Sequence, residues 1–241
     1  MKRIFTIIAL VAMALVAFTA CEKQLIDDDG EVTTPNDVYE YVDLGLPSGL
    51  KWATCNVGAE SPEDYGDYFA WGEVEPKEYY DWSTYKYCEG TSNTLTKYNH
   101  SENYGVVDNK EILDLEDDDA RVNWGGSWRT PSHDEWYELR DYCTIEFVTI
   151  NGIKGIKCTS KIEGYTDRSI FLPATGYMNK DSHLGIDGTN SFNEYGEYLT
   201  NTNYNNHQAG LYFSMQSSED DCFRIVGLRY QLGCTVRPVS H

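Results

Sequence analysis

The chain has 241 residues, of which 39 are acidic and 19 basic, so its formal net charge is −20. A surface this acidic repels phosphate backbones, which excludes nucleic acid as a partner and disfavours anionic membranes except through a lipid anchor. The length is sufficient for one large domain with its own hydrophobic core.

The first twenty residues have the pattern of an export signal rather than of a folded element. A short basic start precedes an apolar run over residues 4–18 that is too short to span a bilayer comfortably. The sequence A-F-T-A-C over residues 17–21 has the small-residue spacing of a lipobox, in which cleavage leaves Cys21 as the lipidated N-terminus. An ordinary signal peptide that ends beside a cysteine is the alternative. We expect residues 1–20 to be a lipoprotein signal peptide, and we expect the lipid on Cys21 to hold the protein at the outer membrane or the cell surface.

A polar and acidic stretch separates Cys21 from the rest of the chain. Residues 22–37 have no apolar period and contain Gly30 and Pro35, which is typical of a flexible linker. No second break of this kind follows. The sequence therefore predicts an acidic tether over residues 21–37 and one folded domain over residues 38–241.

Short strands are predicted throughout this domain. The clearest signal is a hairpin over residues 145–158, where two strand-like runs flank Asn151-Gly152, because Asn-Gly accepts the positive φ angles of a two-residue turn. The other predicted strands cover residues 38–42, 50–54, 170–172, 211–215, 223–228 and 235–239.

Two helices are predicted among these strands. Residues 132–135 have the sequence of a capping box, and Trp136 and Leu139 follow at helical spacing, so a helix is expected over residues 132–143. A shorter helix is expected over residues 111–122. Short, mostly antiparallel strands with two helices and long irregular loops indicate an α+β fold.

Catalytic and metal-binding patterns are not found in the sequence. The five histidines have none of the spacings used in zinc hydrolases, and neither a nucleophile elbow nor a P-loop is present. Six cysteines follow Cys21, and the fifteen disulfide pairings that they allow stay open. The run Asp117-Asp118-Asp119 lacks the interleaved spacing of a calcium loop, so we expect a solvated acidic face there. We therefore expect no enzyme activity, no cofactor and no metal.

Aromatic and amide side chains are the unusual feature of the composition. The chain has 19 tyrosines and 6 tryptophans, and residues 190–206 mix Asn with Tyr and Phe. Such side chains stack and hydrogen-bond at a small cost in conformational entropy, which suits recognition of a glycan or a protein. The alternative is a Tyr-rich loop whose rings only pack on the core. The predicted ligand-binding residues are Tyr177, Asn190, Asn193, Tyr195, Tyr198, Asn203, Tyr204, Gln208 and Tyr212.

Five blocks of the sequence resemble those of the Fibrobacter succinogenes major paralogous domain, which is abundant in lipoproteins of Bacteroidetes. In chain order they are V-D-L-G-L-P-S-G-L-K-W-A-T-C-N-V-G over residues 42–58, Y-G-D-Y-F-A-W-G-E over 65–73, N-W-G-G-S-W-R-T-P over 123–131, F-L-P-A-T-G-Y over 171–177 and G-C-T-V-R-P-V over 233–239. The blocks extend over nearly the whole predicted domain.

This family is similar in turn to the C-type-lectin-like fold of formylglycine-generating enzymes. The link is W-R-T-P-S-H-D-E-W over residues 128–136, where Arg129 and the capped helix are expected to lock a loop onto the core, with Trp136 as a packing plug. The closely spaced copper-binding cysteines of these enzymes have no good counterpart, because Cys222 and Cys234 are twelve residues apart. The chain also has Y-F-S-M over residues 212–215 where the family usually has Y-W-S-S.

The resemblance implies a C-type-lectin-like fold in a non-catalytic envelope lipoprotein. Its loops between Tyr177 and Gln231 are expected to bind a glycan or a protein ligand in adhesion or recognition. Two alternatives stay open: a structural subunit associated with a fimbria and engaged by strand addition, and, less favoured, an oxidase of the formylglycine-generating type.

Overall fold

The computed structural model describes residues 25–26, 32–33, 39–186, 194–204, 207–215 and 223–241. The chain divides into two compact units, residues 1–35 and residues 36–241. In the first unit, the two-residue strands β1 (Leu25–Ile26) and β2 (Val32–Thr33) pair antiparallel. The predicted signal peptide and most of the predicted tether lie outside the described residues.

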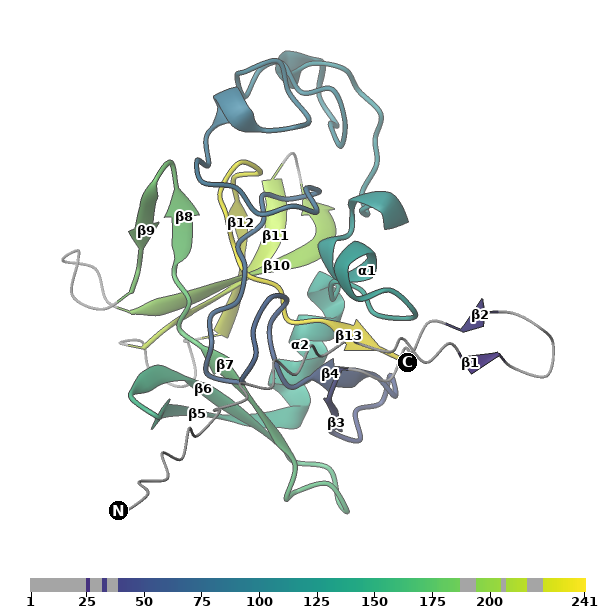
Figure 1. Ribbon diagram of the computed structural model, residues 1–241, viewed down its shortest axis with the longest axis vertical. Helices are drawn as coiled ribbons and strands as arrows, with labels where there is room; N and C mark the ends of the chain where they lie inside the picture. The colour runs from purple at the N-terminus through teal and green to yellow at the C-terminus, as the bar shows by residue number, and fades with distance from the viewer. Residues whose placement is uncertain (1–24, 27–31, 34–38, 187–193, 205–206, 216–222) are drawn as a thin grey trace, which may run out of the picture. The chain divides into compact units, whose positions relative to one another are not determined.

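In the second unit, a small sheet joins the first strands to the last one. Its strands, in spatial order, are β13 (Val239–Ser240), β4 (Lys51–Ala53) and β3 (Tyr41–Asp43) (Figure 1). Trp52 in the middle strand lies opposite both Val42 and Val239 and is fully buried. The strands predicted over residues 38–42 and 50–54 correspond to β3 and β4, with shifted or shorter bounds.

The prediction of one strand over residues 235–239 is wrong in its extent. Thr235 forms a parallel bridge with Tyr198, whereas Val239 pairs antiparallel with β4. Pro238 stands between these two pairings and has no N–H group to donate to a sheet. The chain therefore changes its pairing partner here instead of continuing as a single strand.

The helix predicted over residues 132–143 is confirmed as α2 (His133–Tyr142). Ser132 and Glu135 form the expected capping box: the Ser132 Oγ accepts from the Glu135 N–H, and a Glu135 carboxylate oxygen accepts from the Ser132 N–H at 2.7 Å. Trp136 follows on the inner face of the helix and is fully buried.

Arg129 fastens the loop that precedes this helix. Its guanidinium forms a bidentate ion pair with the Glu135 carboxylate, with N–O distances of 2.8 and 2.5 Å. Its backbone exchanges two hydrogen bonds with Val239 in β13. The expectation that Arg129 and the capped helix lock a loop onto the core, with Trp136 as the plug, is confirmed.

The predicted hairpin is confirmed by β5 (Cys143–Ile150) and β6 (Ile153–Ser160). Asn151 and Gly152 form the two-residue turn, with φ angles of 50° and 87°. A third strand, β7 (Ser169–Pro173), pairs antiparallel with β6 and contains the strand predicted over residues 170–172.

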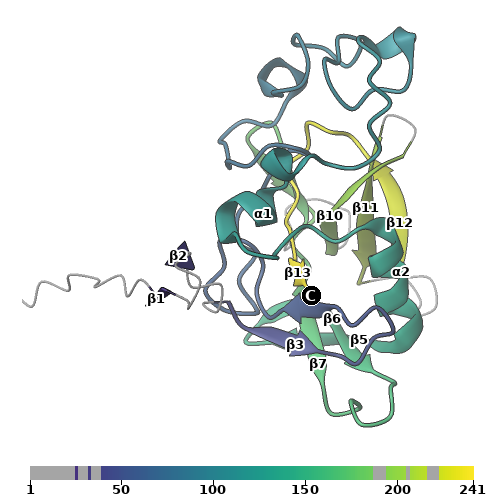
Figure 2. The ribbon, with the colours of Figure 1, turned by 90° about the vertical axis from the view of Figure 1, so that its right-hand side faces the viewer.

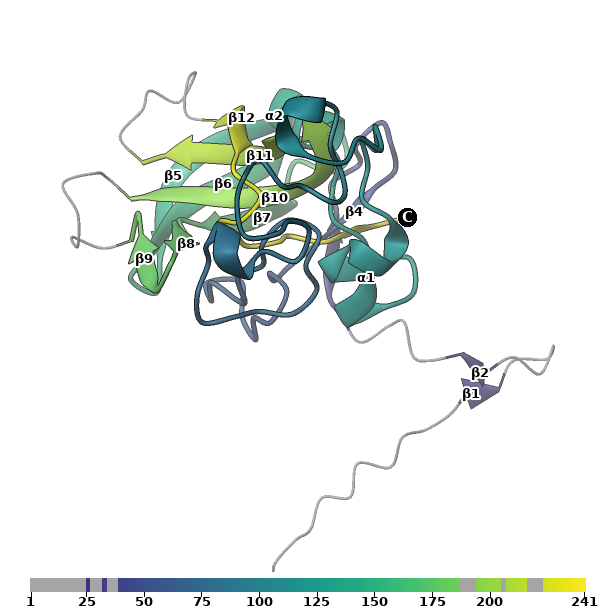
Figure 3. The ribbon, with the colours of Figure 1, turned by 90° about the horizontal axis from the view of Figure 1, so that it is seen from above.

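A central sheet and a short hairpin complete the regular structure. The sheet has the order β10-β11-β12, with β10 at Tyr195–Tyr204, β11 at His207–Ser214 and β12 at Phe223–Leu228. The hairpin is formed by β8 (Tyr177–Asn179) and β9 (Ser182–Leu184), and it lies beside the start of β10 (Figure 3). Strands β11 and β12 match two predicted strands, whereas β8, β9 and β10 were not predicted.

The segment between β4 and α2 is mostly irregular and forms the upper part of the view in Figure 1. Its short elements are the 3₁₀ helices η1 (Trp82–Thr84), η2 (Glu102–Tyr104) and η3 (Leu115–Asp117) and the helix α1 (Asp119–Trp124). Figure 2 shows α1 and α2 as separate helices on different sides of this view. The described elements are thus antiparallel strands and two α-helices, which confirms the α+β class.

The helix predicted over residues 111–122 is wrong in its bounds. The Leu113 N–H donates to the Asn201 carbonyl oxygen at 2.9 Å, so this part of the segment pairs with the edge of β10 instead of coiling. The helix begins only at Asp119, because the Asp118 side chain caps it by accepting from the Arg121 N–H.

The central sheet separates two hydrophobic clusters. Neighbouring residues of β10 point to opposite faces, so Tyr198 belongs to the cluster shared with α2 and Leu199 to the cluster under the irregular segment. Both side chains are fully buried. The largest other fully buried hydrophobic side chains are Trp52, Trp71, Trp136, Tyr80, Tyr98, Tyr230, Phe69 and Phe213.

Candidate functional site

Three half-buried tyrosines from three strands form one aromatic surface, which we call the tyrosine surface. Tyr177 begins β8, Tyr195 begins β10, and Tyr212 lies in β11. The ring centroids of Tyr177 and Tyr195 are 6.0 Å apart, and those of Tyr195 and Tyr212 are 5.5 Å apart. The interplanar angles of 33° and 35° mean that the rings form a gently bent row rather than the walls of a cage.

Strand pairing explains why these rings meet. Glu197 lies directly opposite Tyr212, and the first residue of β10 projects from the same face because side chains alternate along a strand. On the other edge of β10, a parallel bridge joins Gly176 to Gly196 and so places the start of β8, where Tyr177 lies, beside β10. The surface is therefore built on the sheet and not on a loop.

Gly185 makes room for the central ring. It has a φ angle of +81°, and a Cβ atom at this position would overlap the Tyr195 ring. The ring therefore lies directly against backbone just after β9. Only glycine supplies both the positive φ and the space.

A carboxyl group lies beneath the tyrosine surface. The Glu197 side chain is only 6% exposed, and its hydrogen-bond partner among the described residues is the Cys234 thiol, with Sγ 3.9 Å from a carboxylate oxygen. Burial raises the pKa of Glu197 to about 8, although the thiol lowers it slightly. The group is therefore mainly protonated at neutral pH.

The tyrosine hydroxyls also keep their protons. Burial raises the pKa of Tyr195 far above its usual value, and the nearby Tyr177 and Glu197 add to this effect. The pKa of Tyr177 is also raised, mainly by burial and to a smaller extent by the nearby Glu197 carboxylate. The site therefore offers neutral O–H donors and oxygen acceptors next to aromatic faces.

Two of the predicted ligand-binding residues are buried, so the prediction is wrong for them. Tyr198 is fully buried and its hydroxyl donates to the Pro173 carbonyl oxygen at 2.8 Å. Asn203 is 5% exposed; its amide nitrogen donates to the Tyr98 carbonyl oxygen, and its side-chain oxygen accepts from the Tyr230 hydroxyl, each at 2.8 Å. Both side chains hold the core together.

The remaining predicted residues are placed only in part. Tyr204 is the last residue of β10 and Gln208 lies in β11, and the structure describes only their backbone. Asn190 and Asn193 lie outside the described residues. Of the nine predicted residues, the structure thus brings together Tyr177, Tyr195 and Tyr212.

Sequence reasoning missed Glu197, the most unusual polar group of the site. The signal was the alternation of Tyr195, Glu197 and Leu199, which is a strand pattern inside a stretch interpreted as a loop. Arg224 was missed for the same reason: it pairs with Tyr212 across β11 and β12 and is exposed at the edge of the surface.

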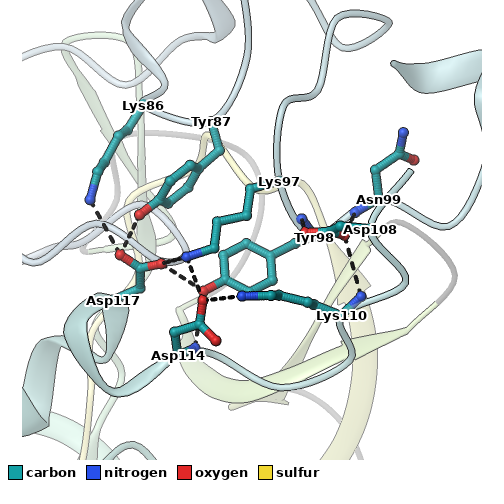
Figure 4. A network of polar contacts seen from close by, with 9 residues as sticks. All are labelled: Lys86, Tyr87, Lys97, Tyr98, Asn99, Asp108, Lys110, Asp114 and Asp117. Carbon is teal, nitrogen blue, oxygen red and sulfur yellow. Dashed lines mark hydrogen bonds and ion pairs between the residues drawn. The ribbon is translucent and has the colours of Figure 1, made fainter. Parts of the chain in front are cut away.

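The acidic run over residues 117–119 is not a solvated face, which corrects the prediction. Asp117, Asp118 and Asp119 are at most 3% exposed. Asp117 accepts hydrogen bonds from the Tyr87 and Tyr98 hydroxyls, and it forms an ion pair with Lys97 (Figure 4). The buried Asp117 carboxylate thus has its charge and hydrogen-bond partners on neighbouring side chains.

These carboxyl groups differ in protonation because their surroundings differ. Burial alone would raise the pKa of Asp117, but hydrogen bonds from Lys97, Tyr87 and Tyr98 outweigh it and hold the pKa at about 2. Asp119 has no cation against it, so burial and the adjacent Asp118 raise its pKa well above the usual value. The Asp117 cluster has the features of an internal anchor for the irregular segment rather than of a ligand site.

The described part of the chain holds no group of three or more His, Cys, Asp or Glu side chains that could bind a metal ion. Its five cysteines form no disulfide with one another; Cys234 is fully buried, and Cys222 lies outside the described residues. No helix among the described residues is long and apolar enough to cross a membrane.

The tyrosine surface and its buried carboxyl group therefore form the strongest candidate site in the described residues. No family model, no curated protein and no solved structure matches the chain significantly.

Proposed function

We propose that this chain is a non-catalytic envelope lipoprotein whose folded domain binds a glycan or protein ligand through the tyrosine surface. The motif blocks between residues 42 and 239 support the finer assignment of a C-type-lectin-like fold within the α+β class. The tyrosine surface supports the binding function, because half-exposed tyrosines are enriched where proteins recognise partners.

One observation carries the binding proposal: three tyrosines far apart in the sequence meet on one face while remaining partly exposed. Twelve aromatic side chains of the described residues are buried in the two clusters, and Tyr177 is packed against the second of them. Tyr195 and Tyr212 belong to neither cluster. All three rings keep part of their surface exposed, and a sugar ring or an apolar side chain could contact them there.

Replacing Tyr195 with alanine is expected to weaken ligand capture at least tenfold, because it removes the central ring of the surface. Binding of the purified domain to an array of immobilised glycans and host-surface proteins measures this effect. Tyr79→Ala is the matched control, since Tyr79 is 41% exposed and is not part of the tyrosine surface. Equal binding by the two variants would remove the tyrosine surface from the proposal.

The membrane anchor is a separate part of the proposal. The lipobox over residues 17–21 supports lipidation of Cys21 and location at the outer membrane or cell surface. Cys21→Ser is expected to shift the protein from the detergent-soluble membrane fraction to the aqueous fraction of expressing cells, while Cys55→Ser leaves it in the membrane. Fractionation with immunoblotting checks this, and a Cys21→Ser protein that stays with the membrane would contradict lipid anchoring.

A structural role by strand addition is the second candidate, and one observation favours it. Among the described residues, β12 pairs only with β11, so its other edge presents unpaired backbone groups. Co-purification of the chain with neighbouring pilin-like proteins, lost when β12 carries a proline at Ile225, would favour this role over ligand capture.

A further inference from the structure

Glu197 has fewer hydrogen-bond partners than Asp117 and Asp118, two other buried acids of the domain. Asp117 has two lysines and two tyrosine hydroxyls as partners, and Asp118 accepts from the Thr130 N–H and hydroxyl at 3.0 and 2.8 Å. Among the described residues, the Glu197 side chain has the Cys234 thiol as its partner at 3.9 Å, a long contact to a weak donor. Burying a carboxyl group with so few partners costs free energy, and such groups are concentrated at functional sites.

The position of Glu197 connects it to the tyrosine surface. It lies opposite Tyr212 on the neighbouring strand and two residues after Tyr195 on the same face of β10. The pKa values of both Tyr177 and Tyr195 respond to its charge, so its carboxyl group lies close to these two rings. It is the only acidic residue in β8, β10 and β11, the strands that carry the three tyrosines.

We propose that the tyrosine surface takes an uncharged, hydroxyl-bearing ring, that is, a saccharide unit, and that the Glu197 carboxyl group is its polar contact. The sugar ring stacks its C–H face on the tyrosines, and its hydroxyl groups pair with the carboxyl group beneath. This inference rests on the proposed binding function and narrows it to one class of ligand.

The protonation state of Glu197 supports a neutral ligand. With a pKa raised by burial to about 8, the carboxyl group at neutral pH has one O–H donor and one carbonyl acceptor. That pair matches a sugar hydroxyl, which both accepts and donates. Tyr177 and Tyr195, which lie near it, keep their protons at neutral pH because burial raises their pKa values.

The charges around the surface argue against ionic ligands. Arg229 is near enough to Tyr177 to lower the pKa of its hydroxyl, so a cationic ligand would meet a guanidinium group beside the surface. An anionic ligand would approach a chain with a net charge of −20. The bent row of rings also lacks the walls with which aromatic cages enclose ammonium groups.

The test is a binding titration of the full mature chain with neutral oligosaccharides of glucose, galactose, mannose and N-acetylglucosamine, with choline as the cationic probe. At pH 6.5 we expect binding to at least one neutral oligosaccharide and none to choline. At pH 9.5 we expect saccharide binding to weaken about 30-fold, because a group with a pKa of about 8 is then largely ionised and has lost its donor.

Two variants distinguish the effect of Glu197 on binding from that of a neighbouring acidic residue. Glu197→Gln keeps a donor and an acceptor at every pH, so the affinity of this variant for the saccharide is expected to be the same at pH 6.5 and at pH 9.5. Glu194→Gln is the matched control: Glu194 also lies beside Tyr195 but pairs with Lys154 at 2.7 Å, so the pH dependence should remain. Circular dichroism confirms folding of both variants.

The outcomes distinguish this inference from the proposed function. Saccharide binding that depends on Tyr195 but not on pH or Glu197 overturns the role of Glu197 and leaves the binding function intact. Choline binding that strengthens with pH and is abolished by Glu197→Gln overturns the neutral-ligand assignment. If no oligosaccharide binds and Tyr195→Ala still captures proteins normally on the array, both the proposed surface and this inference fail.

Discussion

Replacing Asp117 with asparagine is expected to lower the free energy of unfolding by about 3 kcal/mol, as measured by urea denaturation at pH 7. The substitution removes the buried charge that pairs with Lys97 at 2.5 Å and accepts from the Tyr87 and Tyr98 hydroxyls (Figure 4). Breaking a buried pair by removing one partner usually costs about 3–5 kcal/mol. We expect the lower end because Lys97 keeps its second ion pair, with Asp114 at 2.6 Å.

The pH dependence of unfolding gives an independent check on Asp117. Its pKa in the folded protein is lowered to about 2, below the ordinary value of 3.8, so its stabilising effect is complete above pH 3.8 and is lost as the pH falls through 2. The Asn variant should lack this acid-dependent loss. Glu116→Gln is the matched control, since Glu116 is exposed in the same segment and should change stability by less than about 0.5 kcal/mol. Equal effects of the two substitutions would contradict an anchoring role.

Glu197→Gln is expected to raise the free energy of unfolding at pH 9 by about 5 kcal/mol while leaving it unchanged at pH 4. The folded-state pKa of Glu197 is raised from 4.5 to about 8, so the wild type loses stability as the pH rises from 4.5 to 8. Each pKa unit corresponds to about 1.4 kcal/mol, which sets the size of the effect. Glutamine has no charge to bury and avoids this cost.

Thermal or urea unfolding at pH 4, 7 and 9 measures the difference between the two proteins. Glu194→Gln should show little change at any of these pH values, because its ion pair with Lys154 lies at the surface. A constant difference between wild type and Glu197→Gln across the pH range would show that Glu197 does not titrate as its burial implies. A site that gains stability when its acid is removed fits a residue kept for binding rather than for folding.

Elements with strong local signals were predicted well from the sequence. Helix α2 has a capping box and two apolar side chains at helical spacing, and the β5–β6 hairpin has an Asn-Gly turn. In both, the residues that specify the structure are neighbours in the chain. Contacts with the rest of the domain were not needed to recognise them.

Elements that depend on distant partners were predicted poorly. Strand β10 contains Gly196 and several asparagines, and its pairing with β11 and with Thr235 compensates for a weak local preference. The acidic run over residues 117–119 was expected to face solvent because the residues next to it in the sequence do not indicate which side chains it contacts. Lys97, Tyr87 and Thr130 reach it from other parts of the domain.

Only part of the candidate site could be predicted from the sequence. Its tyrosines could be proposed from composition, because ring-rich segments that also contain asparagine favour recognition. Which of them share a face could not be known without the strand register. That register places Tyr195 on the surface and the nearby Tyr198 in the core, and it also brings Glu197 beneath the rings.

The pairing of Val239 with Trp52 closes a loop of nearly 190 residues. Contacts between such distant positions carry a large entropic cost and slow the search for the native state. The small sheet also cannot assemble until the residues around Val239 are available. The sheet of β3, β4 and β13 is therefore expected to be completed late in folding, after locally specified elements such as α2 and the β5–β6 hairpin.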